Sequence, residues 1–149
     1  MKENYERLLA EHDVRPTAIR LLVMDALGTD GRAYSLSELE AKLGTVDKSS
    51  IFRTLTLLHE HNLVHRVEDS QGQTHYAPCA EGCHCHDSHG GMDDLHPHFE
   101  CERCGRVWCF RESALPGVQL PEGFHVHTAS YVLRGLCSSC MRKAKCAHE

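Results

Sequence analysis

Two pairs of cysteines constrain the folding of this chain more than any other feature of its sequence. Each pair has the spacing Cys-x2-Cys, with Cys101 and Cys104 in the first and Cys137 and Cys140 in the second. Four thiolates in two such pairs are typical of a closed tetrahedral zinc site, which leaves no coordination position open for catalysis. The spacing therefore predicts a structural zinc ion that brings the two pairs together. The alternative is four free, buried thiols.

The cysteines also divide the chain into two halves of different chemistry. All 9 of them lie at or after Cys79, and the chain holds 13 histidines as well. An odd number of cysteines, without an apolar signal segment at the N-terminus, favours reduced metal-binding thiols in a cytoplasmic protein. The longest aliphatic run, Leu21 to Met24, is too short to span a membrane. We predict two domains, 1–78 and 79–149, with the boundary at residues 77–79.

The N-terminal half is predicted to fold as helices followed by a β-hairpin. Apolar residues recur with helical spacing after Pro16, which we expect to be the first residue of its helix, and Gly28 marks the end. Ser35 and Glu38 have the spacing of a capping box. The predicted helices are 5–12, 16–27, 36–43 and one that begins near residue 47 or 49, and the predicted strands are 63–67 and 74–76. Three helices and a two-stranded wing form a winged helix-turn-helix, although periodicity alone fits an ordinary helical bundle equally well.

The last predicted helix carries most of the residues expected to contact DNA. In a winged helix-turn-helix this helix enters the major groove with its N-terminal residues at the base edges. The formal net charge of −5 argues against binding by bulk charge, so a local basic patch must dock the protein. The expected contact residues are Lys48, Ser49, Ser50, Phe52 and Arg53. Basic side chains suit phosphate or guanine, and the phenyl ring suits a thymine methyl group.

A second group of metal ligands begins with His96 and His98. Residues two apart in an extended strand point to the same face, so both imidazoles can reach one metal ion. Candidate further ligands are Cys79, Cys109 and, from the wing, His65. A site drawn from both halves would let metal occupancy set the angle between them. The alternative is two surface histidines.

A third group of ligands lies in the glycine-rich segment 81–94, which shows neither helical nor strand periodicity. These possible extra metal ligands are Cys83, His84, Cys85, His86 and His89. Three interpretations stay open for the segment: a further zinc site, a loop that captures metal transiently, or a flexible stretch of soft ligands.

The sequence contains no recognisable set of catalytic residues. It has no glycine-rich phosphate loop, no His-Glu-x2-His and no serine-nucleophile motif. His98-Phe99-Glu100 nominally fits the His-x-Glu of zinc deaminases. That segment runs directly into Cys101, however, and the pairing of four cysteines closes the zinc site. We therefore predict that the protein is not an enzyme.

The order of these motifs resembles that of the Fur (ferric uptake regulator) family of metal-responsive repressors. The most specific segments run from His96 to Gly105 and from Gly135 to Cys140, and the resemblance extends from Arg15 to Cys140. Ser50-Ile51-Phe52-Arg53 is similar to the family's Thr-Val-Tyr-Arg recognition helix. Residues 15–20 are similar to its N-terminal basic turn, which adds Arg15 and Arg20 to the expected DNA contacts.

The resemblance implies an α+β fold with an N-terminal winged helix-turn-helix domain and a C-terminal α/β dimerisation domain stapled by zinc. It also implies a cytoplasmic homodimer. In such proteins the metal-bound dimer represses transcription at A·T-rich palindromic operators in double-stranded DNA.

The resemblance also bears on which metal is sensed. Where iron and peroxide sensors of the family place a histidine and two carboxylates, this chain has Ala33, Ala77 and Cys109. The zinc-sensing Zur branch instead uses an aspartate near the wing, a cysteine and a His-x-His pair. The residues of this chain that fall on that pattern are His65, Cys79, His96 and His98. Thiolate and imidazole suit zinc better than iron, so the resemblance implies a regulatory zinc site, with Cys109 as a candidate substitute ligand.

The sequence departs from the family in three places, one of which is the segment between Cys79 and His96, which is longer and carries the extra cysteines and histidines. The positions of a further family metal site are occupied by Leu95, Pro97, Pro116 and Ala129, none of which offers a side-chain ligand. Phe52 lacks the hydroxyl group of the family's tyrosine.

Alternatives within the family are sensing of iron, of peroxide through thiol oxidation, or of haem through segment 81–94. An alternative outside it is a zinc-buffering protein that does not bind DNA.

Overall fold

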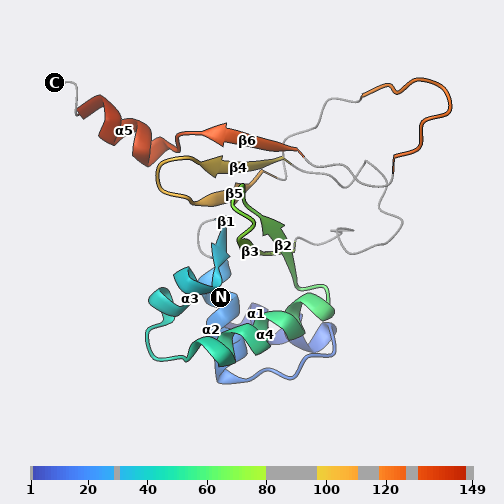
Figure 1. The fold of residues 1–149 in the computed structure, drawn as a ribbon. Coiled ribbons are helices and arrows are strands. Elements are labelled where there is room, and N and C mark those ends of the chain that lie inside the picture. The colour runs from blue at the N-terminus through green and yellow to red at the C-terminus, as the bar shows by residue number, and fades with distance from the viewer. Residues whose placement is uncertain (1, 29–30, 80–96, 111–117, 127–130, 147–149) are drawn as a thin grey trace.

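The computed structural model describes residues 2–28, 31–79, 97–110, 118–126 and 131–146. In its N-terminal half, four helices pack together (Figure 1). They are α1 (Lys2–Glu11), α2 (Ala18–Leu27), α3 (Leu36–Leu43) and α4 (Lys48–Glu60). The core between them includes the fully buried side chains of Leu9, Val23, Leu27, Leu39, Ile51, Leu55 and Leu58. Burial of this apolar face fixes α4 so that its opposite face is exposed. No helix in the described residues is long and apolar enough to cross a membrane.

Polar side chains fix where three of these helices begin. Ser35 caps α3 and Asp47 caps α4, each by accepting a hydrogen bond from the backbone amide three residues further on. Both helix starts agree with the sequence-based prediction. Thr17 caps α2 in the same way. The prediction that Pro16 is the first helical residue is therefore wrong, because it precedes the capping residue and lies outside the helix.

Two histidines tie the C-terminal ends of α1 and α4 together. The Nδ1 atom of His12 donates to the carbonyl oxygen of His61, and Nδ1 of His61 donates to the carbonyl oxygen of His12, each over 2.9 Å. The residue after each histidine, Asp13 or Asn62, has a positive φ, so both helices end in the same kind of turn. The C-terminal end of α4 is thereby anchored to α1.

Six strands form one sheet in the order β2-β3-β1-β5-β4-β6. Their bounds are β1 (Arg32–Ser35), β2 (Val64–Glu68), β3 (Thr74–Pro78), β4 (His98–Cys101), β5 (Val107–Cys109) and β6 (Val132–Gly135). All neighbours are antiparallel except β4 and β6, which run parallel. β2 and β3 are the predicted hairpin wing, within two residues of the expected bounds. Helix α5 (Ser138–Cys146) follows β6 and ends near the C-terminus (Figure 1).

Strand β1 joins the two halves of the chain. On one side Tyr34 pairs with Tyr76 of β3, and on the other Ala33 pairs with Val107 of β5. A small buried cluster at this junction contains Ala33, Val67, Ala77 and Val107. The sheet is therefore continuous across the expected domain boundary at residues 77–79, and the division into domains 1–78 and 79–149 stays a prediction.

The sequence analysis missed some elements and misplaced others. Strand β1 and helix α5 were not predicted, and α1 begins three residues earlier than expected. The alternating residues Phe124–His127, between the two cysteine pairs, also predict a strand, and this prediction is wrong for residues 124–126, which are not a strand. Their alternating pattern satisfies one face of a strand, but a strand also needs a hydrogen-bonded neighbour, and β6 takes the place beside β4.

Candidate metal centres and DNA interface

The four cysteines of the two Cys-x2-Cys pairs converge in the structure. Each offers a sulfur that lies within 4.8 Å of the other three, and Cys104 Sγ lies 3.8 Å from Cys137 Sγ. Tetrahedral zinc with Zn–S bonds of about 2.3 Å requires sulfur atoms about 3.8 Å apart, so this spacing fits the ion. We call Cys101, Cys104, Cys137 and Cys140 the four-cysteine centre. It lies where β4 ends and α5 begins, wholly within the C-terminal half.

Backbone geometry prepares the four-cysteine centre to hold a cation. Burial alone would raise the pKa of the Cys101 thiol, but the amides of Cys104, Cys137 and Arg103 donate to its sulfur and lower the pKa to about 6. Burial and the neighbouring sulfurs raise the pKa of Cys140 to about 12. Four thiolates therefore need a compensating positive charge, which a bound metal ion such as zinc would supply. The turn between the cysteines of the first pair is closed by Gly105, which has a positive φ and donates to the Cys101 carbonyl oxygen.

A second set of ligands meets across the two halves. His65 of β2, His98 of β4 and Cys109 of β5 each offer one ligand atom, and these atoms lie within 4.8 Å of one another. Cys109 Sγ lies 3.5 Å from His65 Nε2. His98 and Cys109 are direct partners in the β4–β5 ladder, so backbone pairing places their side chains together. We call His65, His98 and Cys109 the inter-half centre.

The remaining predicted ligands lie differently with respect to this centre. Cys79 Sγ lies 3.7 Å from Nδ1 of His65, the ring nitrogen that does not face Cys109. His96 and the extra candidates Cys83, His84, Cys85, His86 and His89 lie outside the described residues. Their roles stay predictions. The candidate substitute, Cys109, is thus placed with two of the predicted regulatory ligands.

The expected DNA contacts gather at the N-terminal end of α4. Lys48, Ser49, Phe52 and Arg53 line an open groove of about 540 Å³ together with Leu36 of α3. Phe52 is 50% exposed although it is aromatic, and no described core residue covers it. The hydroxyl group of Ser50 donates to Asp47 over 2.7 Å, so its side chain contributes to the helix cap. Hydrogen bonds from Ser50 also keep the pKa of Asp47 below its ordinary value, and the cap stays ionised at neutral pH.

The basic turn before α2 forms a second exposed patch. Arg15 is exposed, and its carbonyl oxygen accepts a 2.7 Å hydrogen bond from the guanidinium group of Arg20. This hydrogen bond holds the backbone of the turn at Arg15, while the side chain of Arg15 stays exposed. Cations held in this way suit docking to phosphates.

Apolar side chains remain exposed along the outer edge of the sheet. β6 is an edge strand, and its Val132 and Leu133 are 42% and 44% exposed. Leu136 and Met141, which follow it, are also exposed. An edge strand with uncovered apolar residues is a template for pairing with another chain.

Comparisons with known proteins agree on one family. The sequence model for the ferric uptake regulator family matches residues 11–130. A comparison with curated protein sequences finds no match. Among solved structures, the Vibrio cholerae ferric uptake regulator aligns with a TM-score of 0.59 at 18% identity, covering 89% of this chain and 98% of that one.

Two further solved structures extend the similarity to other metal regulators. A zinc-bound manganese uptake regulator aligns with a TM-score of 0.62 at 19% identity, covering 89% of this chain and 98% of that one. A zinc uptake regulator complexed with zinc and DNA aligns with a TM-score of 0.56 at 22% identity, covering 97% and 95%. At these identities the similarity shows the fold. Proteins of this fold have an N-terminal winged-helix domain and a C-terminal dimerisation domain, which confirms the expected fold class.

Proposed function

The chain belongs to the ferric uptake regulator family, and from this premise we propose that it is a zinc-responsive repressor that binds DNA as a homodimer. Proteins of this family are metal-responsive transcription regulators rather than enzymes, in agreement with the absence of a catalytic motif from the sequence. The proposal places the protein in the cytoplasm, where its DNA targets are. Zinc as the sensed metal, repression and the homodimer are the parts that need testing.

The observation that carries the proposal is the inter-half centre. His65 belongs to the wing, whereas His98 and Cys109 belong to the C-terminal half, yet their ligand atoms lie within 4.8 Å of one another. A metal ion bound there ties the wing to the C-terminal half and so favours one orientation of α4. In a dimer, that orientation sets the spacing of the two recognition helices to two half-sites of a palindromic operator. The ion shifts this equilibrium only by its preference for the closed form.

The ligand set favours zinc over iron. The inter-half centre offers two imidazoles and one thiolate, whereas the Cys79 sulfur lies at the other ring nitrogen of His65 and is not counted among them. Ferrous iron sensors rely on hard carboxylate oxygens, which the centre does not contain among its described residues. Borderline-soft nitrogen and sulfur ligands in tetrahedral geometry are typical of zinc. His96 completes the set that we propose.

The edge strand β6 supports a homodimer. No described strand pairs with its outer side, and the exposed side chains of Val132, Leu133 and Leu136 offer a surface that a second copy of this chain would cover. The surface lies on the C-terminal half, opposite the helices that carry the DNA contacts (Figure 1). A dimer formed there leaves both α4 helices free to reach DNA. We propose that residues 79–149 form the dimerisation domain, and this edge strand supports the proposal.

Binding of a labelled A·T-rich palindromic duplex, titrated against buffered zinc, ferrous iron and haem, tests the function. Zinc is expected to increase the affinity of the wild-type protein for the duplex. His98→Ala and Cys109→Ala are expected to remove this increase, because nothing then favours the closed arrangement, while zinc stays at the four-cysteine centre. Cys146→Ala is the matched control, since Cys146 is an exposed cysteine on α5 away from both centres.

Each rival function has its own outcome in this experiment. Stimulation by iron or haem but not by zinc would retain the family function and overturn the assignment of the metal. Loss of binding after peroxide treatment of the thiols, with no effect of zinc, would favour a peroxide sensor. Zinc binding without any binding to duplex DNA, across a library of operators, would favour a zinc-buffering protein.

A further inference from the structure

We propose that Ser70 at the tip of the wing and Glu100 of β4 form a clamp that closes the inter-half centre before zinc binds. The inference rests on the proposed function, because it concerns the affinity of that centre for zinc. Ser70 and Glu100 touch no ligand atom of the centre, so they act as positioning residues.

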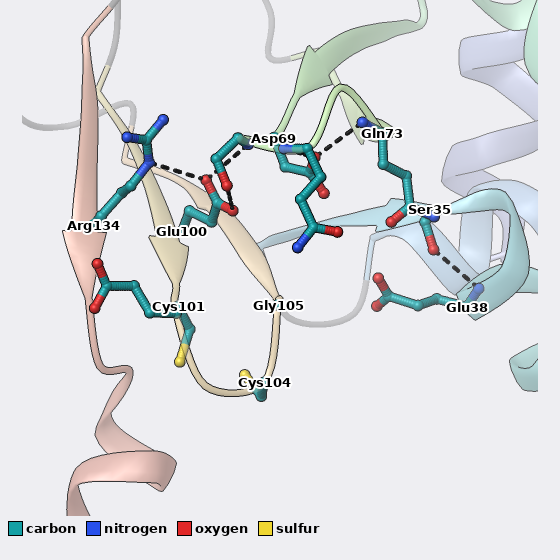
Figure 2. Close-up of a pocket in the computed structure, with 12 residues that line it drawn as sticks. Ser35, Glu38, Asp69, Gln73, Glu100, Cys101, Cys104, Gly105 and Arg134 are labelled. Atoms are coloured by element: carbon teal, nitrogen blue, oxygen red, sulfur yellow. Dashed lines mark hydrogen bonds and ion pairs between the residues drawn. The ribbon is translucent and has the colours of Figure 1, made fainter.

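The clamp is made of two hydrogen bonds to one buried carboxylate. The amide of Ser70 donates to Glu100 over 3.1 Å, and its hydroxyl group donates to the other carboxylate oxygen over 2.7 Å. Glu100 is only 8% exposed, and Arg134 of β6 donates to it over 3.4 Å (Figure 2). Hydrogen bonds to a charged, buried group are roughly twice as strong as those between neutral groups. The contact therefore contributes more than an ordinary surface bond between the halves.

The turn that presents Ser70 is held by its own hydrogen bonds. Asp69 accepts 2.9 Å hydrogen bonds from the amides of Gln71 and Gln73 and from the ring of His75. Burial opposes ionisation of Asp69, but these hydrogen bonds outweigh it and hold its pKa below the ordinary value. The tip is therefore a fixed structure at neutral pH. When Glu100 holds Ser70, it holds the whole hairpin, including the strand that carries His65.

The clamp and two of the metal ligands lie on the same two parts of the chain, the wing and β4. His98 and Glu100 are two residues apart in β4, and residues two apart in a strand point to the same face. His65 lies in β2, and Ser70 lies in the turn that follows it. Two contacts thus join the wing to β4, one at His65 with His98 and one at Ser70 with Glu100. When Ser70 is hydrogen-bonded to Glu100, the imidazoles of His65 and His98 are therefore also brought together.

This geometry predicts how the clamp acts on zinc affinity. A metal ion binds only the closed form, so its apparent dissociation constant increases as the closed fraction of the metal-free protein falls. The pairing of β1 with β5 also holds the halves together, so loss of the clamp weakens closure without abolishing it. One hydrogen bond to a charged group corresponds to a change of about tenfold in an equilibrium constant.

Ser70→Ala and Glu100→Gln test the clamp in protein that already holds zinc at the four-cysteine centre. Each variant is titrated with buffered zinc, and the fluorescence of Trp108 is recorded. Trp108 is the single tryptophan of the chain, and it lies on β5 with the Arg32 guanidinium 5.9 Å from its ring centre, so it reports on the junction of the halves. Glu102→Gln is the matched control, because Glu102 lines the same pocket of about 470 Å³ but is not the acceptor for Ser70.

The expected result is a zinc midpoint raised by up to about tenfold in Ser70→Ala and in Glu100→Gln, with Glu102→Gln unchanged; the full tenfold is reached where the metal-free protein is mostly open. The double variant is expected to be no weaker than the more impaired single variant, since both substitutions remove one shared contact. Before zinc is added, Trp108 emission in both single variants is expected to move to longer wavelength. Wild-type midpoints in the single variants, or additive effects in the double variant, would overturn the clamp.

His98→Ala, titrated alongside, separates this inference from the proposed function. If His98→Ala still binds the second zinc ion with wild-type affinity, the inter-half centre itself is misplaced. If His98→Ala loses that ion while Ser70→Ala binds it normally, only the clamp is overturned. Zinc content and thermal unfolding of each variant show that the four-cysteine centre and the fold are retained.

Discussion

The two candidate metal centres of this protein have similar ligands but opposite positions relative to the two halves of the chain. The four-cysteine centre lies within one half of the chain, with three of its four cysteines buried, and its sulfurs receive backbone amides from neighbouring residues. The inter-half centre takes one ligand from the wing and two from the C-terminal half. A centre contained in one unit can only stabilise that unit, whereas a centre shared between two units responds to their arrangement. The comparison predicts a permanent ion at the first centre and an exchangeable ion at the second.

The largest effect is expected from Cys101→Ser, which removes a ligand of the four-cysteine centre. A structural zinc ion contributes about 10–16 kcal/mol in small zinc domains. That is comparable with the whole stability of a typical domain, about 5–15 kcal/mol. The C-terminal half is therefore expected to unfold and the protein to become monomeric, as measured by circular dichroism and sedimentation. Cys146→Ser is the control, and a folded dimer that lacks this zinc would contradict the prediction.

A smaller effect is expected when the pH is lowered in the presence of a chelator: the inter-half centre should lose its ion, while the four-cysteine centre keeps its own. Zinc needs deprotonated ligands, and two of the three residues at the inter-half centre are imidazoles, whose ordinary pKa is about 6.5. Zinc-stimulated DNA binding should therefore fade as the pH falls through that range. The four-cysteine centre, whose four ligands all come from one half of the chain and are mostly buried, should keep its ion longer. Metal analysis and fluorescence anisotropy measure the two losses, and simultaneous release of both ions would remove the distinction.

Arg53→Ala and Arg15→Ala are expected to weaken docking without affecting sensing. Residues 1–78 carry more acidic than basic side chains, so a few placed cations must supply the attraction to DNA. Each lost phosphate contact should reduce the slope of log affinity against log salt by about one. We expect the exposed Arg15 to enter a narrow A·T minor groove.

The zinc midpoint is expected to be unchanged in both arginine variants, because neither side chain lies at a metal centre. Arg7→Ala is the matched control, since Arg7 is an exposed cation on α1 that pairs with Glu11. Wild-type affinity of both variants across the salt series would show that this docking surface is wrong.

The smallest effect is expected from Ser35→Ala, which removes the cap of α3. Loss of an N-cap side chain lowers the free energy of unfolding by about 1 kcal/mol. The change should lie in the N-terminal half, whose stability depends on its apolar core rather than on zinc. Denaturant unfolding measures it, with the zinc content of the four-cysteine centre as a second readout. Ser37→Ala, an exposed residue in the first turn of the same helix, should change the stability less; equal losses would contradict the capping role.

Local signals predicted most of the N-terminal half. Ser35 and Asp47 begin their helices where the sequence indicates, because a cap depends only on residues three apart. The convergence of the four cysteines was also predictable, since a Cys-x2-Cys pair defines its own turn. The pairing of the first Cys-x2-Cys with the second follows from the requirement of a tetrahedral zinc ion for four ligands.

Contacts between distant segments were harder to predict. Strand β1 has only four residues, and its pairing with both β3 and β5 depends on the packing of two halves rather than on its own pattern. Tertiary packing also decides two other contacts. Cys79 lies at the second ring nitrogen of His65, and Ser70 is hydrogen-bonded to Glu100. Sequence spacing indicates which residues can bind metal, but tertiary pairing decides which atoms face one another.

The parallel pairing of β4 with β6 has a consequence for the order in which the protein is made. Cys101 and Cys104 leave the ribosome before β6 and the second cysteine pair exist, and at about 5–20 residues per second the delay is a few seconds. During that interval the first pair offers zinc two thiolates instead of four, and the edge of β4 is open to other chains. Each newly made molecule thus has an incomplete four-cysteine centre and an unpaired β4 until the second cysteine pair and β6 are made and one zinc ion binds. The supply of zinc during synthesis is therefore expected to govern how many regulator molecules reach the folded state.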